Sequence, residues 1–270
     1  MTLEKNINKE EYLKIKDYSH YTNLKKKTHK YLDKIYRNNF SHRPVIGSCS
    51  YLYKLFQPSS YEDFLKQYTE YTYGPTKELC GRSLDQLLTL SKLFQEKSEE
   101  ENANNKYFPE LTFDDYFDLL VLHIIIETFD GQRVEEKYRE MYENIGCEIE
   151  LPSEKDDARL GIDFIIKTDD GDHFVQVKPR TFATSASSGT RADREHHFVK
   201  EQSIKDKYGN DSRLEFIFYE RDEETGEVYT YINKRTGKIR FKLSDVCETN
   251  GFTKFPSKKG FQTEFELKKM

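Results

Sequence analysis

The sequence lacks the features that mark zinc-binding, disulfide-rich and membrane-spanning proteins. Its four cysteines are far apart and form no Cys-x-x-Cys pair, a spacing that excludes a conventional zinc or disulfide framework and predicts reduced thiols in a cytoplasmic protein. The longest apolar run, LLVLHIII at residues 119–126, is too short to span a bilayer. The polar N-terminal residues predict no signal peptide. We therefore expect no membrane partner.

The sequence also lacks the overall positive charge typical of nucleic-acid-binding proteins. Its net charge is -5 at pH 7, which on its own argues against such a partner. The charge is unevenly distributed, however, because residues 1–45 contain 11 Lys and Arg against 5 Asp and Glu. A basic segment can bind phosphates even when the whole chain is acidic. The composition therefore leaves a DNA partner open.

The chain has the aromatic content of a folded protein and two kinds of local pattern. Aromatic residues make up 14% of the chain, which excludes a fully disordered protein, and a length of 270 residues is enough for one core or for one core with a helical lobe. Helical patterns fill residues 1–110, with the polar stretch 96–110 as the expected linker or exposed loop. Residues 111–270 begin with a long helical pattern, capped by Thr112 and ended by Gly146, and continue as short strands around a helix near 194–208. This order predicts an α/β fold, a mixed central β-sheet flanked by helices, behind an N-terminal helical lobe.

One expected hairpin, GIDFIIKTDDGDHFVQVKPRTF at residues 161–182, places polar side chains where apolar ones dominate. Asp170-Gly171 predicts a two-residue turn. Pairing outward from that turn places Asp163 opposite Lys178, and the period of two places Gln176 on the same face. A slip of one residue would separate the three groups. The opposite face is expected to form core through Ile162, Phe164, Val175 and Val177.

This trio suits phosphodiester hydrolysis, which needs a divalent cation, a positioned water and positive charge for the developing anion. Mg²⁺ prefers oxygen ligands, which the Asp163 carboxylate and the Gln176 amide would supply. Lys178 would orient or deprotonate the water or neutralise charge. An acid, twelve residues and Gln-x-Lys form the PD-(D/E)XK nuclease pattern with Gln in the second acidic position. Glu135, beside the buried stripe of the preceding helix, is a further candidate metal ligand.

Simpler interpretations exist for each of these residues. Asp163 and Lys178 on a hairpin are commonly only a cross-strand ion pair, and Glu135 would more often be a solvated helix residue. Basic side chains of the N-terminal lobe and of the 180–200 region are candidate DNA contacts, or are simply exposed. The candidate nucleic-acid-binding residues are Arg43, Arg180, Arg191 and Lys200.

Three segments resemble type II restriction endonucleases, and the MjaI-like family most closely. They are RPVIGSCSYLYKLF at 43–56, IIETFDGQRVEEKY at 125–138, and GIDFII with FVQVKPRTF in the hairpin, which is also similar to the TaqI endonuclease. The resemblance implies a restriction-endonuclease-like catalytic domain over 111–270 and a DNA-contacting lobe over 1–110. It further implies a Mg²⁺-dependent homodimer that cuts double-stranded DNA at a CTAG-type site, paired with a protecting methyltransferase. Aligned to the family, the helix acid falls nearer Glu136 than Glu135, so both stay candidates.

Two other functions remain open from the sequence. One is a repair or junction-resolving nuclease of the same fold, which would not cut a plasmid into discrete bands. The other is a non-catalytic nucleic-acid-binding module, for which Gln176 in place of an acid leaves room. Absence of cleavage with Mg²⁺ or Mn²⁺ would favour that module.

Overall fold

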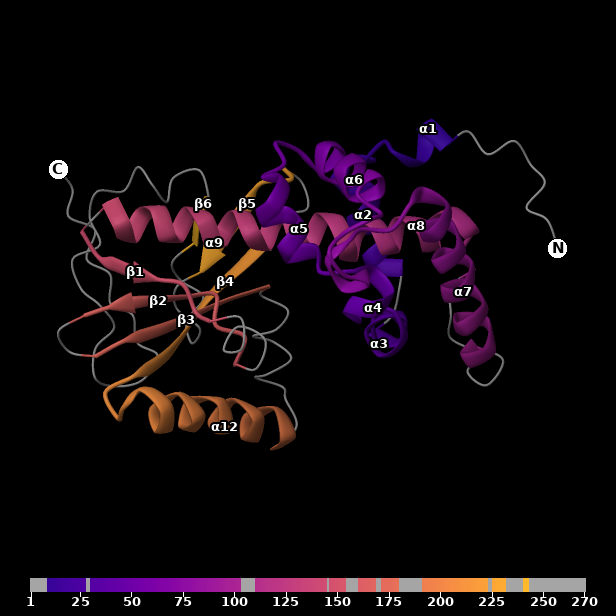
Figure 1. Cartoon of the computed structure of the whole chain (residues 1–270). Coiled ribbons are helices and arrows are strands. Elements are labelled where there is room, and N and C mark those ends of the chain that lie inside the picture. Colours follow the sequence, from indigo (N-terminus) through magenta and orange to yellow (C-terminus); the bar gives the residue numbers. More distant parts are fainter. Residues whose placement is uncertain are drawn as a thin grey trace. The chain divides into compact units, whose positions relative to one another are not determined.

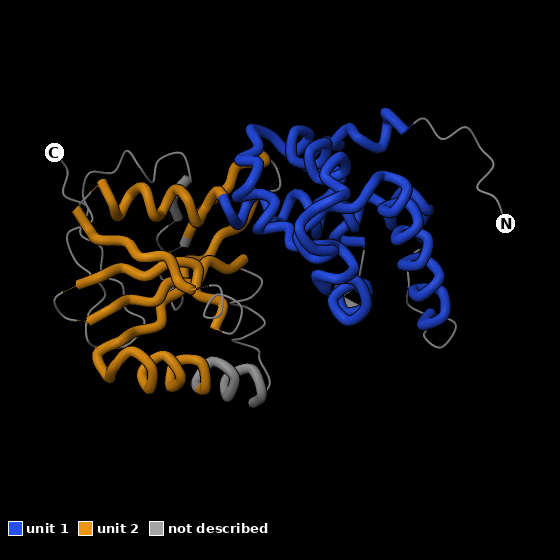
Figure 2. The backbone as a smooth tube through the Cα atoms, in the orientation of Figure 1, with its two compact units in different colours: residues 1–132 blue, residues 133–270 orange. Residues whose placement is uncertain are grey.

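The computed structural model describes residues 9–27, 30–102, 110–144, 146–153, 160–168, 171–179, 191–222, 225–231 and 240–242. The chain divides into two compact units, Met1–Gln132 and Arg133–Met270 (Figure 2). The division therefore falls inside helix α9 (Glu127–Asn144) and not near residue 110. The apolar run 119–126 is the reason, because its buried side chains belong to the core of the first unit. None of the described helices is long and apolar enough to cross a membrane.

The first unit is helical. Its helices are α1 (Lys9–Tyr12), α2 (Tyr18–Lys27), α3 (Lys30–Asn39), α4 (Arg43–Ile46), α5 (Cys49–Phe56), α6 (Tyr61–Glu70), the 3₁₀ helix η1 (Lys77–Leu79), α7 (Leu84–Asn102), α8 (Phe113–Val121), the π-helix η2 (Leu122–Ile126) and the start of α9. Thr112 caps α8 through a capping box with Asp115, as the sequence predicts. The linker prediction is wrong for residues 96–102, which continue α7. Side-chain pairs one turn apart support this polar helix end, as Lys97 does with Glu100.

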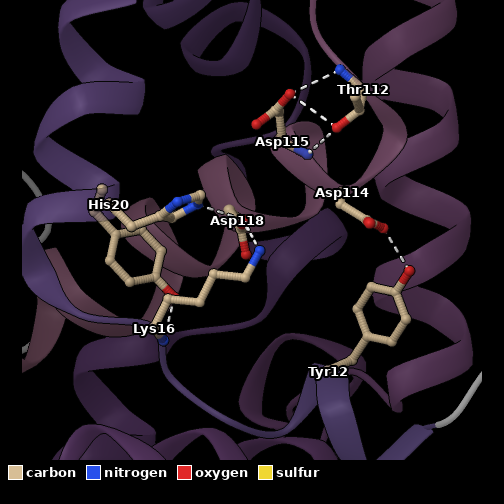
Figure 3. Close-up of polar contacts among 8 residues, drawn as sticks. Tyr12, Lys16, His20, Thr112, Asp114, Asp115 and Asp118 are labelled. Carbon is tan, nitrogen blue, oxygen red and sulfur yellow. Dashed lines mark hydrogen bonds and ion pairs between the residues drawn. The ribbon is translucent and has the colours of Figure 1, made fainter.

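A buried carboxylate ties the N-terminal segment of the first unit to α8. Asp118 is only 5% exposed. Its Oδ2 lies 2.7 Å from both Lys16 Nζ and His20 Nε2 (Figure 3). Beside it, the Tyr12 hydroxyl donates to Asp114 Oδ1 at 2.5 Å. Because a buried carboxylate needs such partners, this cluster fixes where the N-terminal segment lies on α8.

The second unit contains a six-stranded sheet in sequence order (Figure 1). Its strands are β1 (Glu148–Glu150), β2 (Phe164–Lys167), β3 (His173–Pro179), β4 (Arg213–Arg221), β5 (Val228–Tyr231) and β6 (Arg240–Lys242). Neighbouring strands are antiparallel except β3 and β4, which are parallel. Helix α12 (Arg191–Tyr208) lies in the crossover between those two strands, as a parallel pair requires. The predicted mixed α/β fold is confirmed.

Helices cover both faces of this sheet (Figure 1). On one face α9 packs through Val134, Tyr138, Met141 and Tyr142 against Phe164, Ile166, Val175 and Val177. On the other face α12 packs through Ile204 against Ile165, Phe174, Phe216 and Phe218. Gly146, with φ +87°, follows the end of α9 as the sequence predicts. The sheet is therefore buried on both sides, and a polar side chain within it needs a specific partner.

The hairpin β2–β3 differs from the prediction in two respects. Ile165 pairs with Phe174, so the register is shifted by two residues and Asp163 does not pair with Lys178. The connection between the strands is closed at Thr168 and Gly171 and not at the predicted two-residue turn, because the Gly171 N–H donates to the Thr168 carbonyl oxygen and the Thr168 hydroxyl donates to the Gly171 carbonyl oxygen. Ile162 packs with the α12 side because it precedes β2, where strand alternation does not apply.

Candidate active site

Asp163 and Lys178 lie together at the β2–β3 pair despite the shifted register. A shift of two residues preserves the face of every side chain, so Gln176 and Lys178 both face α12 with Phe174. Lys178 Nζ is 4.0 Å from Asp163 Oδ2, and the two side chains are 25% and 20% exposed. The Val177 N–H donates to the same Oδ2 at 2.6 Å. The carboxylate is thus held against the middle residue of Gln-x-Lys and still reaches solvent.

Gln176 is completely buried beside this pair. Its Nε2 donates to the Leu160 carbonyl oxygen at 2.5 Å, which fixes the orientation of the amide because a carbonyl only accepts. Its Oε1 is buried and, among the described residues, receives no hydrogen bond. A buried amide oxygen left in this state is costly unless a donor or a cation meets it. A buried amide oxygen without a hydrogen-bond donor among the described residues is the most unusual feature of the site, and it is called the orphaned oxygen below.

Helix α12 adds a second lysine that sequence reasoning grouped only with general DNA contacts. Lys200 Nζ lies 3.6 Å from the point where a Cβ at Gly161 would sit, and Gln176 Nε2 lies 3.9 Å from that same point. Burial lowers the pKa of Lys200, and Lys178 lowers it further while Asp163 opposes the shift. Gly161 has φ +64°, which favours glycine. No sequence signal separated Lys200 from the other lysines of its helix.

The oxygen donors of the site, one carboxylate and one amide oxygen, are of the kind that a hard cation prefers. No group of three or more His, Cys, Asp or Glu side chains that could hold a metal ion occurs in the described part of the chain. Glu135 is 2% exposed on α9, the helix that covers the sheet face opposite Gln176 and Lys178, and Glu136 is half-buried. A metal here would therefore depend on Asp163 and the Gln176 oxygen, and a role for Glu135 or Glu136 stays a prediction.

The remaining DNA-contact candidates lie elsewhere. Arg43 is exposed at the start of α4, in the first unit. Arg180 lies outside the described residues, and Arg191 begins α12 with a side chain outside them. Sequence reasoning missed Arg82, which is 6% exposed. Its guanidinium donates to six backbone carbonyl oxygens, those of Arg43, Pro44, Val45, Lys77, Cys80 and Gly81.

Comparison with known proteins identifies a family through most of the chain. The family model described as MjaI restriction endonuclease matches residues 31–241, which is 211 of the 270 residues. No curated protein and no solved structure matches. The matched range includes residues 43–45, whose carbonyl oxygens accept hydrogen bonds from Arg82, and the hairpin that carries Asp163, Gln176 and Lys178. The chain belongs to the MjaI restriction endonuclease family.

Proposed function

We propose that this protein is a type II restriction enzyme, a sequence-specific endonuclease that hydrolyses double-stranded DNA with Mg²⁺ at a PD-(D/E)XK-type site. One observation carries the proposal. A partly exposed carboxylate and ammonium, Asp163 and Lys178, lie 4.0 Å apart beside the buried, orphaned amide oxygen of Gln176. An ordinary cross-strand ion pair would explain the first two groups but not the third. Membership of a restriction endonuclease family supports the same reaction.

Each residue has a role set by its position. Asp163 and Gln176 Oε1 would hold Mg²⁺, which when bound polarises the phosphodiester and activates water. The Val177 N–H keeps the Asp163 carboxylate in place by donating to its Oδ2. Lys178 orients the attacking water and stabilises the negative charge that develops on the phosphate. Because Gln176 is neutral, the site would hold the metal less tightly than one with two acids, and the DNA phosphate would supply more of the oxygen ligands.

The family also supports finer proposals about the substrate. A CTAG-type target, a homodimer that cuts both strands, and a partner methyltransferase that protects the host site follow from the resemblance of the three segments. Arg43 is exposed, and the carbonyl oxygens of residues 43–45 are fixed by Arg82. A guanidinium presented from a fixed backbone is suited to guanine recognition in the major groove.

Digestion of unmodified phage DNA with the purified protein and Mg²⁺, followed by sequencing of the ends, tests this function. Discrete fragments with one common end sequence are expected. Lys178→Ala should abolish cleavage and leave DNA binding largely intact. Lys167→Ala is the matched control, because Lys167 lies at the far end of β2 and pairs with Glu150 and Asp172.

Other outcomes identify the two alternatives. Cleavage confined to branched or damaged DNA would indicate a repair or junction nuclease. Tight DNA binding without cleavage in Mg²⁺ or Mn²⁺ would indicate a non-catalytic module, a function for which the neutral Gln176 in the second acidic position leaves room.

A further inference from the structure

A second ammonium group reaches the site from α12. Lys200 is partly buried, and its Nζ and the Gln176 amide nitrogen lie within 3.6 Å and 3.9 Å of one point beside Gly161. Lys200 forms no hydrogen bond or ion pair within the described part of the chain. Two other lysines in the described part of α12 differ from Lys200. Lys205 forms an ion pair with Glu201, and Lys207 is exposed.

Among the described residues, the charged side chains around this point do not balance. Lys178 and Lys200 each carry a positive charge, Asp163 carries one negative charge, and Gln176 is neutral. The pKa of Lys200 is lowered by burial and by Lys178, which shows that its charge is held in an unfavourable place. A partly desolvated ammonium without a partner is costly unless an anion binds to it. An anionic group bound against Lys200 would offset this cost.

We propose that Lys200 binds a non-bridging oxygen of the scissile phosphate and stabilises the extra negative charge of the transition state. The inference rests on the proposed function and assigns the phosphate to a particular side chain. In the reaction, the water oxygen forms a new bond to phosphorus and the ester P–O bond breaks; one proton of the water ends on the leaving oxygen and the other remains on the oxygen newly bonded to phosphorus. Lys200 stays protonated throughout, so its contribution is electrostatic.

This assignment also explains the neutral residue in the second acidic position. A carboxylate at position 176 would add a negative charge near Lys200, since Lys200 Nζ and the Gln176 amide nitrogen approach the same point beside Gly161, and it would weaken the attraction of Lys200 for an anion. The amide instead donates to the Leu160 carbonyl oxygen. The ammonium of Lys200 is therefore left available to a phosphate oxygen.

The test is a double-mutant cycle between the lysine and the phosphate. The probes are a short duplex containing the mapped cut site and the same duplex with a neutral methylphosphonate at the scissile position. Binding of wild type, Lys200→Met and Lys200→Arg is measured by fluorescence anisotropy in EDTA, so that no metal contributes. Lys207→Met, an exposed lysine two turns along α12, is the control.

Lys200→Met is expected to bind the natural duplex about tenfold more weakly and the methylphosphonate duplex as well as wild type does. Lys200→Arg should keep most of the affinity, and Lys207→Met should behave as wild type on both duplexes. With Mg²⁺, Lys200→Met should also lose about 100-fold or more in single-turnover cleavage rate. Thermal unfolding checks that the variants fold, and Lys200→Gln replaces any variant that does not.

The possible failures are distinct. If the wild type cuts no duplex with Mg²⁺ or Mn²⁺, the proposed function falls and the role of Lys200 falls with it. If the wild type cuts DNA but Lys200→Met weakens both duplexes equally, or neither, only the contact between Lys200 and the scissile phosphate is overturned.

Discussion

Replacing Gln176 with leucine separates a metal-binding role of this side chain from a structural one. The amide is completely buried, its Nε2 donates to the Leu160 carbonyl oxygen, and its Oε1 receives no hydrogen bond among the described residues. Gln176→Leu removes the orphaned oxygen, a gain of about 1–3 kcal/mol, and leaves the Leu160 carbonyl oxygen without its donor, a loss of similar size. The two changes oppose each other, so the metal-free unfolding free energy should change by less than about 2 kcal/mol.

The effect of Mg²⁺ on stability should change much more. An ion at ten times its dissociation constant stabilises the folded state by about 1.4 kcal/mol. For the 138-residue unit Arg133–Met270 this corresponds to a rise in Tm of about 3–6 °C. The wild type should show this rise and Gln176→Leu should not, because the leucine offers no oxygen to the ion. Cleavage should be lost together with the stabilisation.

Calorimetric unfolding in EDTA and in a series of Mg²⁺ concentrations measures both quantities on the same samples. Gln202→Leu is a suitable control, because Gln202 is exposed on α12 and bonds only to Asp206 in the described contacts. That variant should keep the wild-type response to Mg²⁺ and the wild-type cleavage rate. An unchanged Mg²⁺ response in Gln176→Leu would refute the assignment of Oε1 as a metal ligand.

Two further predictions concern the first unit. Arg82→Met removes the buried guanidinium that donates to six backbone carbonyl oxygens. The free energy of unfolding, measured by urea denaturation, should therefore fall by at least about 3 kcal/mol. A loss below about 1 kcal/mol would contradict this role of Arg82. Burial alone would raise the pKa of Glu127, but His123 and Lys25 outweigh burial and hold it below its usual value. A carboxylate of this kind stabilises the fold above the unfolded pKa, roughly 4.3, and loses that contribution as pH falls through the folded pKa. As the pH is lowered from 5 towards 3, the unfolding free energy of the wild type should therefore drop more steeply than that of Glu127→Gln. The difference between the two drops should be well under about 1 kcal/mol, because the Glu127 side chain is 39% exposed. Parallel curves for the two proteins would exclude the effect.

Features set by neighbours along the chain were predictable from the sequence. The Thr112 cap and the glycine after α9 follow from backbone chemistry within a few residues. The shared face of Gln176 and Lys178 follows from strand alternation, which an even shift of register leaves intact. The prediction of a linker or loop failed for residues 96–102, which are helical. A polar sequence is typical of a loop, but charge pairs one turn apart also stabilise a helix.

Features set by contacts between distant segments appeared only in the tertiary structure. The sequence alone determined that an acid, an amide and a lysine lie on one hairpin, because their spacing and the period of a strand are local properties. Only the packing of α12 on the sheet placed Lys200 beside Gly161, and only the path of residues 160–163 turned the Gln176 amide toward the Leu160 carbonyl and left its oxygen orphaned. Burial and charge at this site depend on which segments meet in space, and that is decided by the whole fold.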